Sequence, residues 1–519
     1  MRRFLGGKKG LDARHATAFR DTFVVRGRRF SLLFSEMKPS FLPSIMERVR
    51  LHALSFSMPH NPRIMYSAQT LLNKPPAFHL TLLLATLTPL YISSYHYRLH
   101  HPYGQTTHLH SPSEPATSSA TFINDWLSVH LLSPFNPSAL TTYCNQTAWD
   151  PYLVFNLADA NGGIGNIRGN ILDFVFYALE AGASIMLPTM ATRSPEDLSN
   201  VWASRGGFDI MFDEGWFLSA LGRACPQMGV YKPRSQEEMV EPLEGVYVPP
   251  SRRVDVEGGN SREGFRAHLG SWVRERKSEG EGMVLVNVGR TLWEVDTRSL
   301  PAGFRRNFGQ LLRINPVIRR LAAIVVERLA TERDLKIDPL AAIPPQAFYG
   351  AHLRTEADAQ AIGWLNEPNT NFSAQTDAYI AHALSHGLRT IYVSSGSAEE
   401  IARFASKAAS HSPPLTVVSK HSLLPPQGLR DLDALTWDQQ ALVDYEVLLR
   451  ASVFGGFVKS SFSYNIAMTR AQWGKDRGRV VEPWRVLHEE VGVAFDDGLS
   501  RVVGRDGWHE GRIPRGMWP

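Results

Sequence analysis

Cysteine is scarce in this chain of 519 residues, which has only Cys144 and Cys225. Two cysteines are too few for a disulfide-rich scaffold or for a zinc site made of cysteines. In an oxidising compartment the two can form one disulfide, and two unrelated buried thiols are the alternative. The sequence leaves this choice open.

Charge is modest and unevenly distributed. Charged residues make up 20% of the chain and hydrophobic residues 43%, which is typical of a globular protein. The formal net charge is +5, and basic residues gather near the amino terminus. The body of the chain has no basic patch interleaved with aromatic residues, so we expect no nucleic-acid partner. The length is sufficient for two ordinary domains with additional segments.

One long apolar run stands out at residues 77–95, and it contains no Asp, Glu, Lys or Arg. Its length is marginal for a bilayer span, which needs about 20 residues. Because basic residues precede the run, the positive-inside rule predicts a signal anchor that leaves the following chain in the lumen. A cleaved signal peptide and a buried helix are the alternatives.

The segments on either side of this run differ in composition. Residues 1–76 are basic and lack sustained periodicity, which predicts a disordered tail. Residues 96–145 begin with a stretch rich in His, Ser, Thr and Pro, which is typical of a stem or linker. N-glycosylation sequons start at Asn145 and Asn371. Together these features predict a single-pass type II protein of the Golgi or endoplasmic reticulum membrane.

A strand, a glycine-rich loop, a helix and a second strand are predicted in residues 150–190. Glycines at the start of a helix allow close approach of a ligand, and the free N–H groups there attract anions. We therefore expect a site for a phosphorylated or otherwise polar ligand. The alternative is a tight turn from strand to helix. Asn161, Asn166 and Arg168 favour the ligand, because a structural turn needs neither an amide nor a guanidinium group.

Strands and helices alternate along the rest of the chain. This pattern predicts two facing, doubly wound Rossmann-like domains at residues 146–315 and 316–500, followed by a carboxy-terminal tail at 501–519. We expect Asp209 and Asp213 to be solvated or to serve as helix caps rather than to act in acid–base chemistry or to bind a metal. The further strands are predicted at residues 284–288, 347–353, 390–393, 415–418 and 453–457, and the further helices at 315–328, 376–386, 439–451 and 464–472.

Polar residues follow two of these strands. His352 and Arg354 come at the end of one strand, with Glu356 and Asp358 just beyond, and a serine-rich segment at 459–463 follows the other. Ligands of such sheets bind beyond the carboxyl ends of the strands. A guanidinium group suits a diphosphate and can neutralise a leaving group without a metal. The one Asp-x-Asp motif, at 431–433, does not directly follow a strand, which favours metal-independent chemistry.

Four segments carry a recognisable pattern: GGIGNIRGNILDFVFYALEAGASIMLP from Gly162, FDIMFDEGWFLSAL from Phe208, GAHLRTEAD from Gly350 and DYEVLLRASVFGGFVKSSFSYNIAMTR from Asp444. Together they resemble the GDP-fucose O-fucosyltransferase superfamily, in particular its fungal-type members. The resemblance implies a GT-B fold with the nucleotide bound mainly by the second domain. It also implies inverting transfer of fucose from GDP-fucose to a hydroxyl of a protein or glycan, without a metal or other cofactor.

The resemblance further implies roles for individual residues. Arg354 and Asn166 are the expected catalytic residues, with Arg354 holding the β-phosphate. Asp159 is considered as a base. The residues expected to bind the nucleotide sugar are Gly162, Gly163, Gly165, His352, Arg354, Asp444, Ser460, Ser461 and Phe462.

Two other functions are compatible with parts of the sequence. An NADP-dependent oxidoreductase would use the glycines at 163, 165 and 169 together with Arg193 to hold the 2′-phosphate. This hypothesis leaves the segments around Arg354 and Ser460 without a role. A luminal carbohydrate-binding protein that has kept the fold and lost transfer is the other alternative.

Overall fold

The computed structural model describes residues 22–25, 28–31, 118–132, 134–157, 160–232, 243, 245–249, 262–277, 282–479, 492–504 and 515–519. Residues 1–111 and 112–519 form separate compact units. In the first unit, strands β1 (Thr22–Val25) and β2 (Arg28–Ser31) pair antiparallel, and the disordered tail expected at 1–76 stays a prediction. The predicted anchor at 77–95 lies outside the described residues. Within the described part, no helix is long and apolar enough to cross a membrane.

The carboxy-terminal half of the second unit is built on a six-stranded sheet in the order β11-β10-β9-β12-β14-β13. All neighbouring strands are parallel except β13, which runs antiparallel to β14. The four strands predicted in this half are confirmed to within a few residues as β9, β10, β11 and β12, whereas β13 and β14 are not among the predicted strands. The bounds are β9 Tyr349–His352, β10 Thr390–Ser394, β11 Thr416–Val418, β12 Val453–Phe457, β13 Val493–Asp496 and β14 Ser500–Val503.

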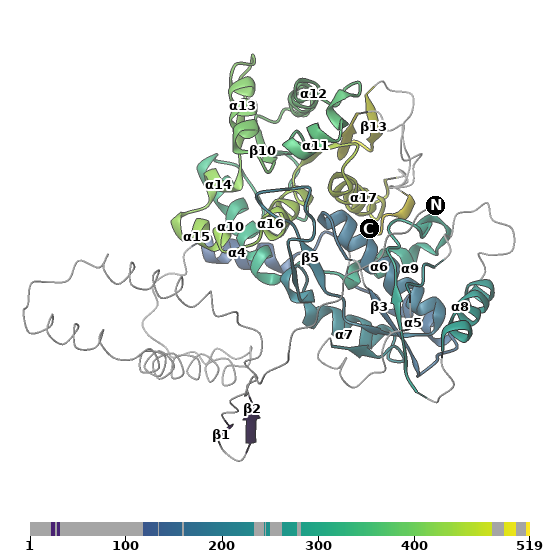
Figure 1. The fold of residues 1–519 in the computed structure, drawn as a ribbon. Helices are drawn as coiled ribbons and strands as arrows, with labels where there is room; N and C mark the ends of the chain where they lie inside the picture. Colours follow the sequence, from purple (N-terminus) through teal and green to yellow (C-terminus); the bar gives the residue numbers. More distant parts are fainter. Residues whose placement is uncertain are drawn as a thin grey trace, which may run out of the picture. The chain divides into compact units, whose positions relative to one another are not determined.

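Helices cover both faces of this sheet, as Figure 1 shows. On β10, Ile391 and Val393 pack into one apolar cluster, and Tyr392 between them packs into another. Side chains alternate across a strand, so these two clusters lie on opposite faces. The doubly wound prediction is therefore confirmed for this half. The surrounding helices are α10 Pro316–Glu332, α12 Phe372–Ser385, α13 Ala398–Ala409, α16 Trp437–Leu449 and α17 Ser461–Lys475.

The amino-terminal half contains a four-stranded parallel sheet in the order β7-β4-β3-β8. The predicted strand, loop, helix and strand are confirmed as β3, the loop, α6 and β4. Helix α6 ends where Gly182 adopts a left-handed conformation with φ of 73°, as the sequence suggests. Asp213 caps α7 by accepting from the Trp216 N–H at 2.9 Å, which confirms the cap interpretation. The bounds are β3 Leu153–Leu157, α6 Ile164–Ala181, β4 Ser184–Met186, α7 Glu214–Ala224, β7 Val230–Tyr231, α8 Arg262–Arg276, β8 Val284–Val288 and α9 Ala302–Phe308.

The faces of this second sheet are covered unequally by the residues that the structure describes. Helix α6 and its neighbours pack on the face formed by Phe155, Ile185 and Val286. The opposite face carries a small cluster of Val154, Met186 and Leu285, joined by partly buried residues of the strands. We therefore describe this half as an α/β layer built on one face of a parallel sheet.

Two predicted boundaries are wrong. The stem was expected to reach residue 145, but helices α4 (Ser118–Ser128) and α5 (Ser138–Asn145) belong to the folded unit. Trp126 of α4 is 1% exposed, so this segment contributes to the core. The tail was expected to begin at 501, but β14 extends through the sheet to Val503 and Trp518 is fully buried. Burial of large apolar side chains explains both differences.

The two cysteines form a disulfide. The Cys144–Cys225 bond joins the end of α5 to the end of α7, with 5.5 Å between the Cα atoms. This settles the choice that the sequence leaves open. The crosslink fastens the segment before β3 to the amino-terminal half, and it is compatible with an oxidising compartment.

Candidate functional site

The three glycines between β3 and the first turn of α6 have different local surroundings. Gly162 has φ of 95°, a conformation that favours glycine. Gly163 precedes the helix, and a side-chain Cβ there would meet nothing within 4 Å. Gly165, two residues further on and already in α6, would place a Cβ against the main-chain carbonyl of Ser461. Gly165 is therefore required by the close approach of α6 to the start of α17.

The same contact brings the two halves of the unit together through polar groups. The Ser461 hydroxyl donates to Asn166 Oδ1 at 2.5 Å, across 295 positions of sequence. Asn166 was predicted from the first half and Ser461 from the second. The structure places them in direct contact.

Arg168, in the first turns of α6, has a different role from the ligand contact that the sequence suggests. It is buried, and its guanidinium donates to the main-chain oxygens of Gly309 at 2.8 Å, Trp518 at 2.5 Å and Pro519 at 2.7 Å. These bonds fix the last described residues to the amino-terminal half. Arg168 therefore stabilises the fold, and its guanidinium gives no support to the ligand interpretation of the loop.

The segment after β12 forms the opposite wall of the site. Ser460 caps α17, because its hydroxyl accepts from the Ser463 N–H. The Ser463 hydroxyl shares a hydrogen bond of 2.7 Å with His352 Nδ1 at the end of β9. The His352 ring lies 4.6 Å from the ring of Phe462. Burial lowers the pKa of His352 to about 4, so this imidazole is neutral at physiological pH.

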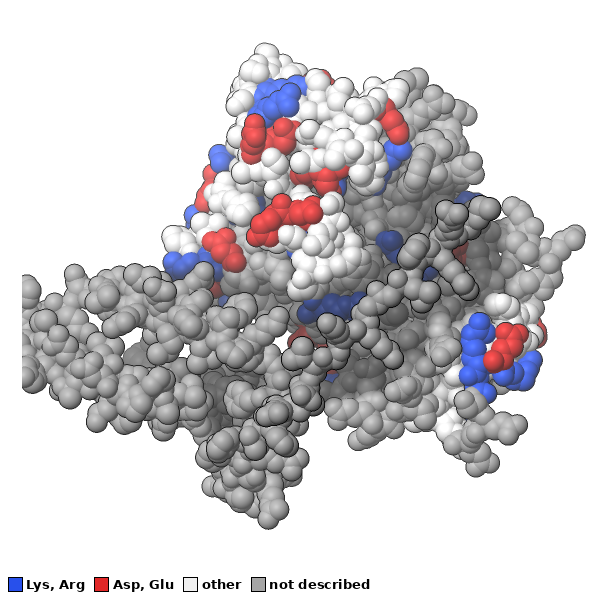
Figure 2. Space-filling view, in the orientation of Figure 1, with Lys and Arg blue, Asp and Glu red and all other residues white. Residues whose placement is uncertain are grey.

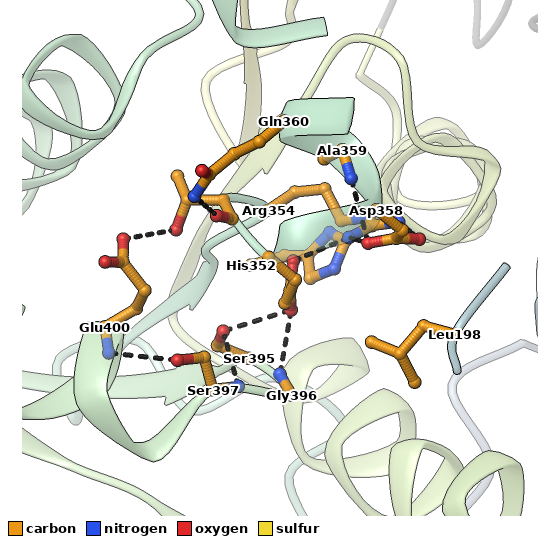
Figure 3. A network of polar contacts seen from close by, with 12 residues as sticks. Leu198, His352, Arg354, Asp358, Ala359, Gln360, Ser395, Gly396, Ser397 and Glu400 are labelled. Carbon is orange, nitrogen blue, oxygen red and sulfur yellow. Dashed lines mark hydrogen bonds and ion pairs between the residues drawn. The ribbon is translucent and has the colours of Figure 1, made fainter. Parts of the chain in front are cut away.

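Arg354 lies in a network of carboxylates just beyond β9, shown in Figure 3. Its Nη1 donates to Glu356 at 2.7 Å and to Asp358 at 2.8 Å, and its Nη2 donates to Asp358 at 2.5 Å. The other Glu356 oxygen accepts from the Gly396 N–H at 2.8 Å. Burial alone would raise the pKa of both carboxylates, but the Arg354 charge and the hydrogen bonds hold the pKa of each below its usual value.

These residues surround a cavity of about 400 Å³ between the two halves. A cavity of this size is in the range of small-molecule binding sites. Of the predicted site residues, Gly163, Asn166, His352, Arg354, Asp444, Ser460, Ser461 and Phe462 line it. Gly162 and Gly165 do not line it, and Asp159 lies outside the described residues.

Asp444 lies deeper in this cavity. It accepts from Lys420 Nζ at 2.6 Å, from the Tyr392 hydroxyl at 2.6 Å and from the Ser394 hydroxyl at 3.1 Å. The carboxylate is therefore already satisfied by three donors. Its predicted contact with a nucleotide would be made by a group held rigidly in place.

Several lining residues have no role in the fucosyltransferase site expected from the sequence, and Arg193 is considered there only as a 2′-phosphate ligand of an oxidoreductase. Arg193 immediately follows strand β5 (Met190–Thr192), and Lys420 comes two residues after β11. The rule that ligands bind beyond the carboxyl ends of strands could have found both. Trp437 and Asp438, in the first turn of α16, carry no such signal. Among the residues that the structure describes, no group of three or more His, Cys, Asp or Glu side chains is arranged to hold a metal.

A family model described as GDP-fucose protein O-fucosyltransferase matches residues 152–472. The chain belongs to this family. The match spans both halves of the unit and every residue that the sequence places in the site. The protein is therefore a glycosyltransferase by family.

Solved structures of fucosyltransferases are similar to the chain at a lower level. POFUT1 in complex with GDP is 14% identical, with a TM-score of 0.36, covering 62% of this chain and 96% of that one. NodZ from Bradyrhizobium is 13% identical, with a TM-score of 0.33, and the match covers 60% of this chain and 91% of NodZ. A variant of Arabidopsis thaliana FUT1 in complex with GDP is 12% identical, with a TM-score of 0.34, and the match covers 69% of this chain and 78% of FUT1. A search of curated protein sequences finds no match.

Proposed function

We propose that this protein transfers fucose from GDP-fucose to a hydroxyl group of a protein or glycan, with inversion at the anomeric carbon. The observation that carries the proposal is the cavity between the two halves, which has Arg354 and the start of α17 on one wall and Asn166 on the other. Family membership supports the donor.

The expected reaction is a direct displacement. The acceptor oxygen forms a bond to the anomeric carbon while the bond from that carbon to the β-phosphate oxygen breaks, and the electron pair leaves with GDP. The acceptor proton passes to solvent or to a group of the site. Negative charge develops on the β-phosphate, so groups that stabilise it there lower the barrier.

Arg354 and α17 are suited to that charge. A guanidinium has five N–H donors, so Arg354 can keep its carboxylate partners and still donate to a phosphate. The start of α17, a helix of 15 residues, offers free N–H groups and the hydroxyls of Ser460 and Ser461. With these groups in place the reaction needs no metal ion, and we propose that it uses none.

The neutral His352 and the ring of Phe462 form an adjacent wall of the cavity. We propose that both contact the nucleotide, with Asp444 deeper in the same cavity. Their mutual packing at 4.6 Å keeps these side chains in place before a ligand arrives.

The direct test uses Arg354→Lys in the full chain. Arg354→Ala would leave Glu356 as a buried charge without its partner, which is strongly destabilising and would confuse binding with folding. Lysine keeps the charge but loses the planar fork, so we expect GDP-fucose to bind roughly 10- to 100-fold more weakly. Calorimetry with EDTA present measures this and also tests whether a metal is needed.

Arg403→Lys is the matched control, because Arg403 is exposed and lies outside the cavity, where it pairs with Glu400 at 3.5 Å and stacks on the Phe372 ring at 3.8 Å. We expect Arg403→Lys to bind GDP-fucose with the same affinity as the unchanged protein. Equal affinity of Arg354→Lys and the control would contradict the phosphate role. Selective GDP-fucose binding without transfer to any acceptor would instead favour the carbohydrate-binding alternative. Stabilisation by NADP and not by GDP would favour the oxidoreductase, although Gly165 is already committed to the contact with Ser461.

We also propose that residues 77–95 anchor the protein in the membrane of the Golgi or endoplasmic reticulum, with the transferase in the lumen. The Cys144–Cys225 disulfide supports a luminal, oxidising environment. A reporter fused after residue 95 should stay in the membrane fraction. A freely secreted reporter would show a cleaved signal peptide instead.

A further inference from the structure

Arg193 reaches the donor cavity from the amino-terminal half. It follows β5, which pairs antiparallel with β6 (Ser204–Gly206) to form a hairpin. Its main-chain N–H donates to Asp438 Oδ2 at 2.7 Å in the first turn of α16. Its guanidinium lies over the Trp437 ring, 5.2 Å from the centroid. These contacts fix the side chain across the boundary between the two halves.

The guanidinium of Arg193 uses few of its donors. Nη1 donates to the carbonyl of Leu198 at 2.8 Å. The two carboxylates nearby are distant for hydrogen bonds, with Asp358 at 3.6 Å and Asp438 at 4.0 Å. Nε is buried and has no hydrogen-bond partner among the described residues. A guanidinium has five N–H donors, and leaving buried donors unpaired costs free energy.

Arg193 and Arg354 converge on one atom. Asp358 Oδ2 lies 2.5 Å from Arg354 Nη2 and 3.6 Å from Arg193 Nη1. Because both guanidinium groups reach the same carboxylate oxygen, one diphosphate placed beside Asp358 can contact both of them. Arginine is well suited to such planar recognition of phosphate oxygens.

We propose that Arg193 is a second diphosphate-binding residue, which contributes a guanidinium from the amino-terminal half to the donor held by Arg354. This inference rests on the proposed function. A diphosphate would accept hydrogen bonds from the unused donors of Arg193 and would join the hairpin to the other half. Donor binding would then draw the two halves together around the sugar. Asp358 holds both guanidinium groups near the position that the phosphates take.

The test compares GDP with guanosine on the full chain, using Arg193→Met and Arg193→Lys. Methionine keeps an apolar stem over Trp437 and removes the donors, so we expect GDP to bind roughly 10- to 100-fold more weakly. Guanosine, which has no phosphate, should bind within about twofold of the unchanged protein. Lysine restores the charge without the planar fork, so the affinity of Arg193→Lys for GDP should lie between that of Arg193→Met and that of the unchanged protein.

Arg205→Met is the matched control. Arg205 lies on the same hairpin and also stacks on a tryptophan, 5.2 Å from the Trp202 ring, but it is exposed. Its GDP affinity should be unchanged. If Arg193→Met binds GDP as tightly as the control, the inference is wrong while the proposed function stands. If Arg193→Met loses affinity for GDP and for guanosine equally, the inference is also wrong, because an equal loss would show that Arg193 has a structural role. If the unchanged protein binds neither GDP nor GDP-fucose, the proposed function itself fails.

Discussion

Two strand–loop–helix units meet at the cavity, and they use their polar residues differently. In the amino-terminal unit, β3 to α6, Gly165 makes room for the other half and Arg168 fixes the carboxy-terminal residues. In the carboxy-terminal unit, β12 to α17, the residues at 460–462 line the cavity. The same strand–loop–helix arrangement thus serves mainly to hold the two halves together in the first unit and mainly to line the cavity in the second. A glycine-rich loop alone does not indicate which role applies.

The difference has a steric origin. Ser461 needs a glycine opposite its carbonyl in order to approach α6, and that approach brings its hydroxyl to Asn166. Of the amino-terminal loop, Gly163, Ile164 and Asn166 remain to face the cavity. Figure 2 shows the face drawn in Figure 1, where the described part of the carboxy-terminal half carries both acidic and basic side chains. The groups that suit a diphosphate lie inside the cavity.

The largest expected effect sharpens this contrast. Arg168→Met removes the hydrogen-bond donors to three main-chain oxygens and leaves those oxygens without these bonds. Breaking such a buried network should lower the free energy of unfolding by about 3–5 kcal/mol. The affinity of the folded variant for GDP should stay within about threefold, because the side chain does not line the cavity. Urea unfolding and calorimetry measure the two quantities.

Arg403→Met is the control for Arg168→Met, and it should change the stability by less than about 0.5 kcal/mol. A stable Arg168→Met variant that has lost GDP binding would reverse the roles assigned to the two units.

The second prediction concerns His352 in the carboxy-terminal unit. Burial lowers its pKa to about 4, whereas a histidine in an unfolded chain titrates near 6.5. Between these values the unfolded chain binds the extra proton, so the free energy of unfolding falls as the pH drops from about 6.5 to about 4. His352 contributes at most about 3 kcal/mol to this fall.

His352→Gln should therefore flatten the dependence of stability on pH in that window. His130 and His382 are shifted in the same direction, with pKa values of about 3 and about 4, so part of the dependence must remain. His411→Gln, a change at an exposed histidine, should leave the curve unchanged. A curve for His352→Gln that coincides with this control would show that the buried imidazole does not resist protonation.

The third prediction compares two glycines of one loop. Gly165→Ala places a methyl group against the Ser461 carbonyl, so it should lower the stability by about 1–3 kcal/mol. It should also weaken GDP-fucose transfer, because the two walls of the cavity separate. Gly163→Ala has open space around the new methyl group, so it should lower the stability by no more than about 1 kcal/mol, the cost of alanine at the N-cap of α6. Thermal unfolding of both variants decides the matter, and equal melting temperatures would contradict the steric account.

Much of the architecture was predictable from local pattern. Strand β8 and strand β12 have the predicted bounds, because short apolar runs between turn residues specify buried parallel strands. Gly182 and Asp213 act as the helix caps that their positions suggest. The sequence motifs also led to the family that the model of residues 152–472 shows.

Other features depend on contacts between distant parts of the chain. The composition of the segment before residue 118 is typical of a linker and predicts a stem through residue 145, where the structure has helices α4 and α5. Their burial follows from packing, with α4 against α10 and α5 against α9. The Cys144–Cys225 pairing depends on helices that lie 81 positions apart. Local composition carries no information on either contact.

The sequence by itself determined the main strands and helices within residues 150–190 and 284–472, which strand ends carry polar groups, and the family to which the chain belongs. The reason is that periodicity, caps and motifs are local properties. Only the tertiary structure decided that Arg168 holds the carboxy-terminal residues, that Gly165 makes room for Ser461, and that Arg193 joins Arg354 beside Asp358. Those roles arise where segments far apart in sequence meet, and no local pattern encodes which atoms will face each other there.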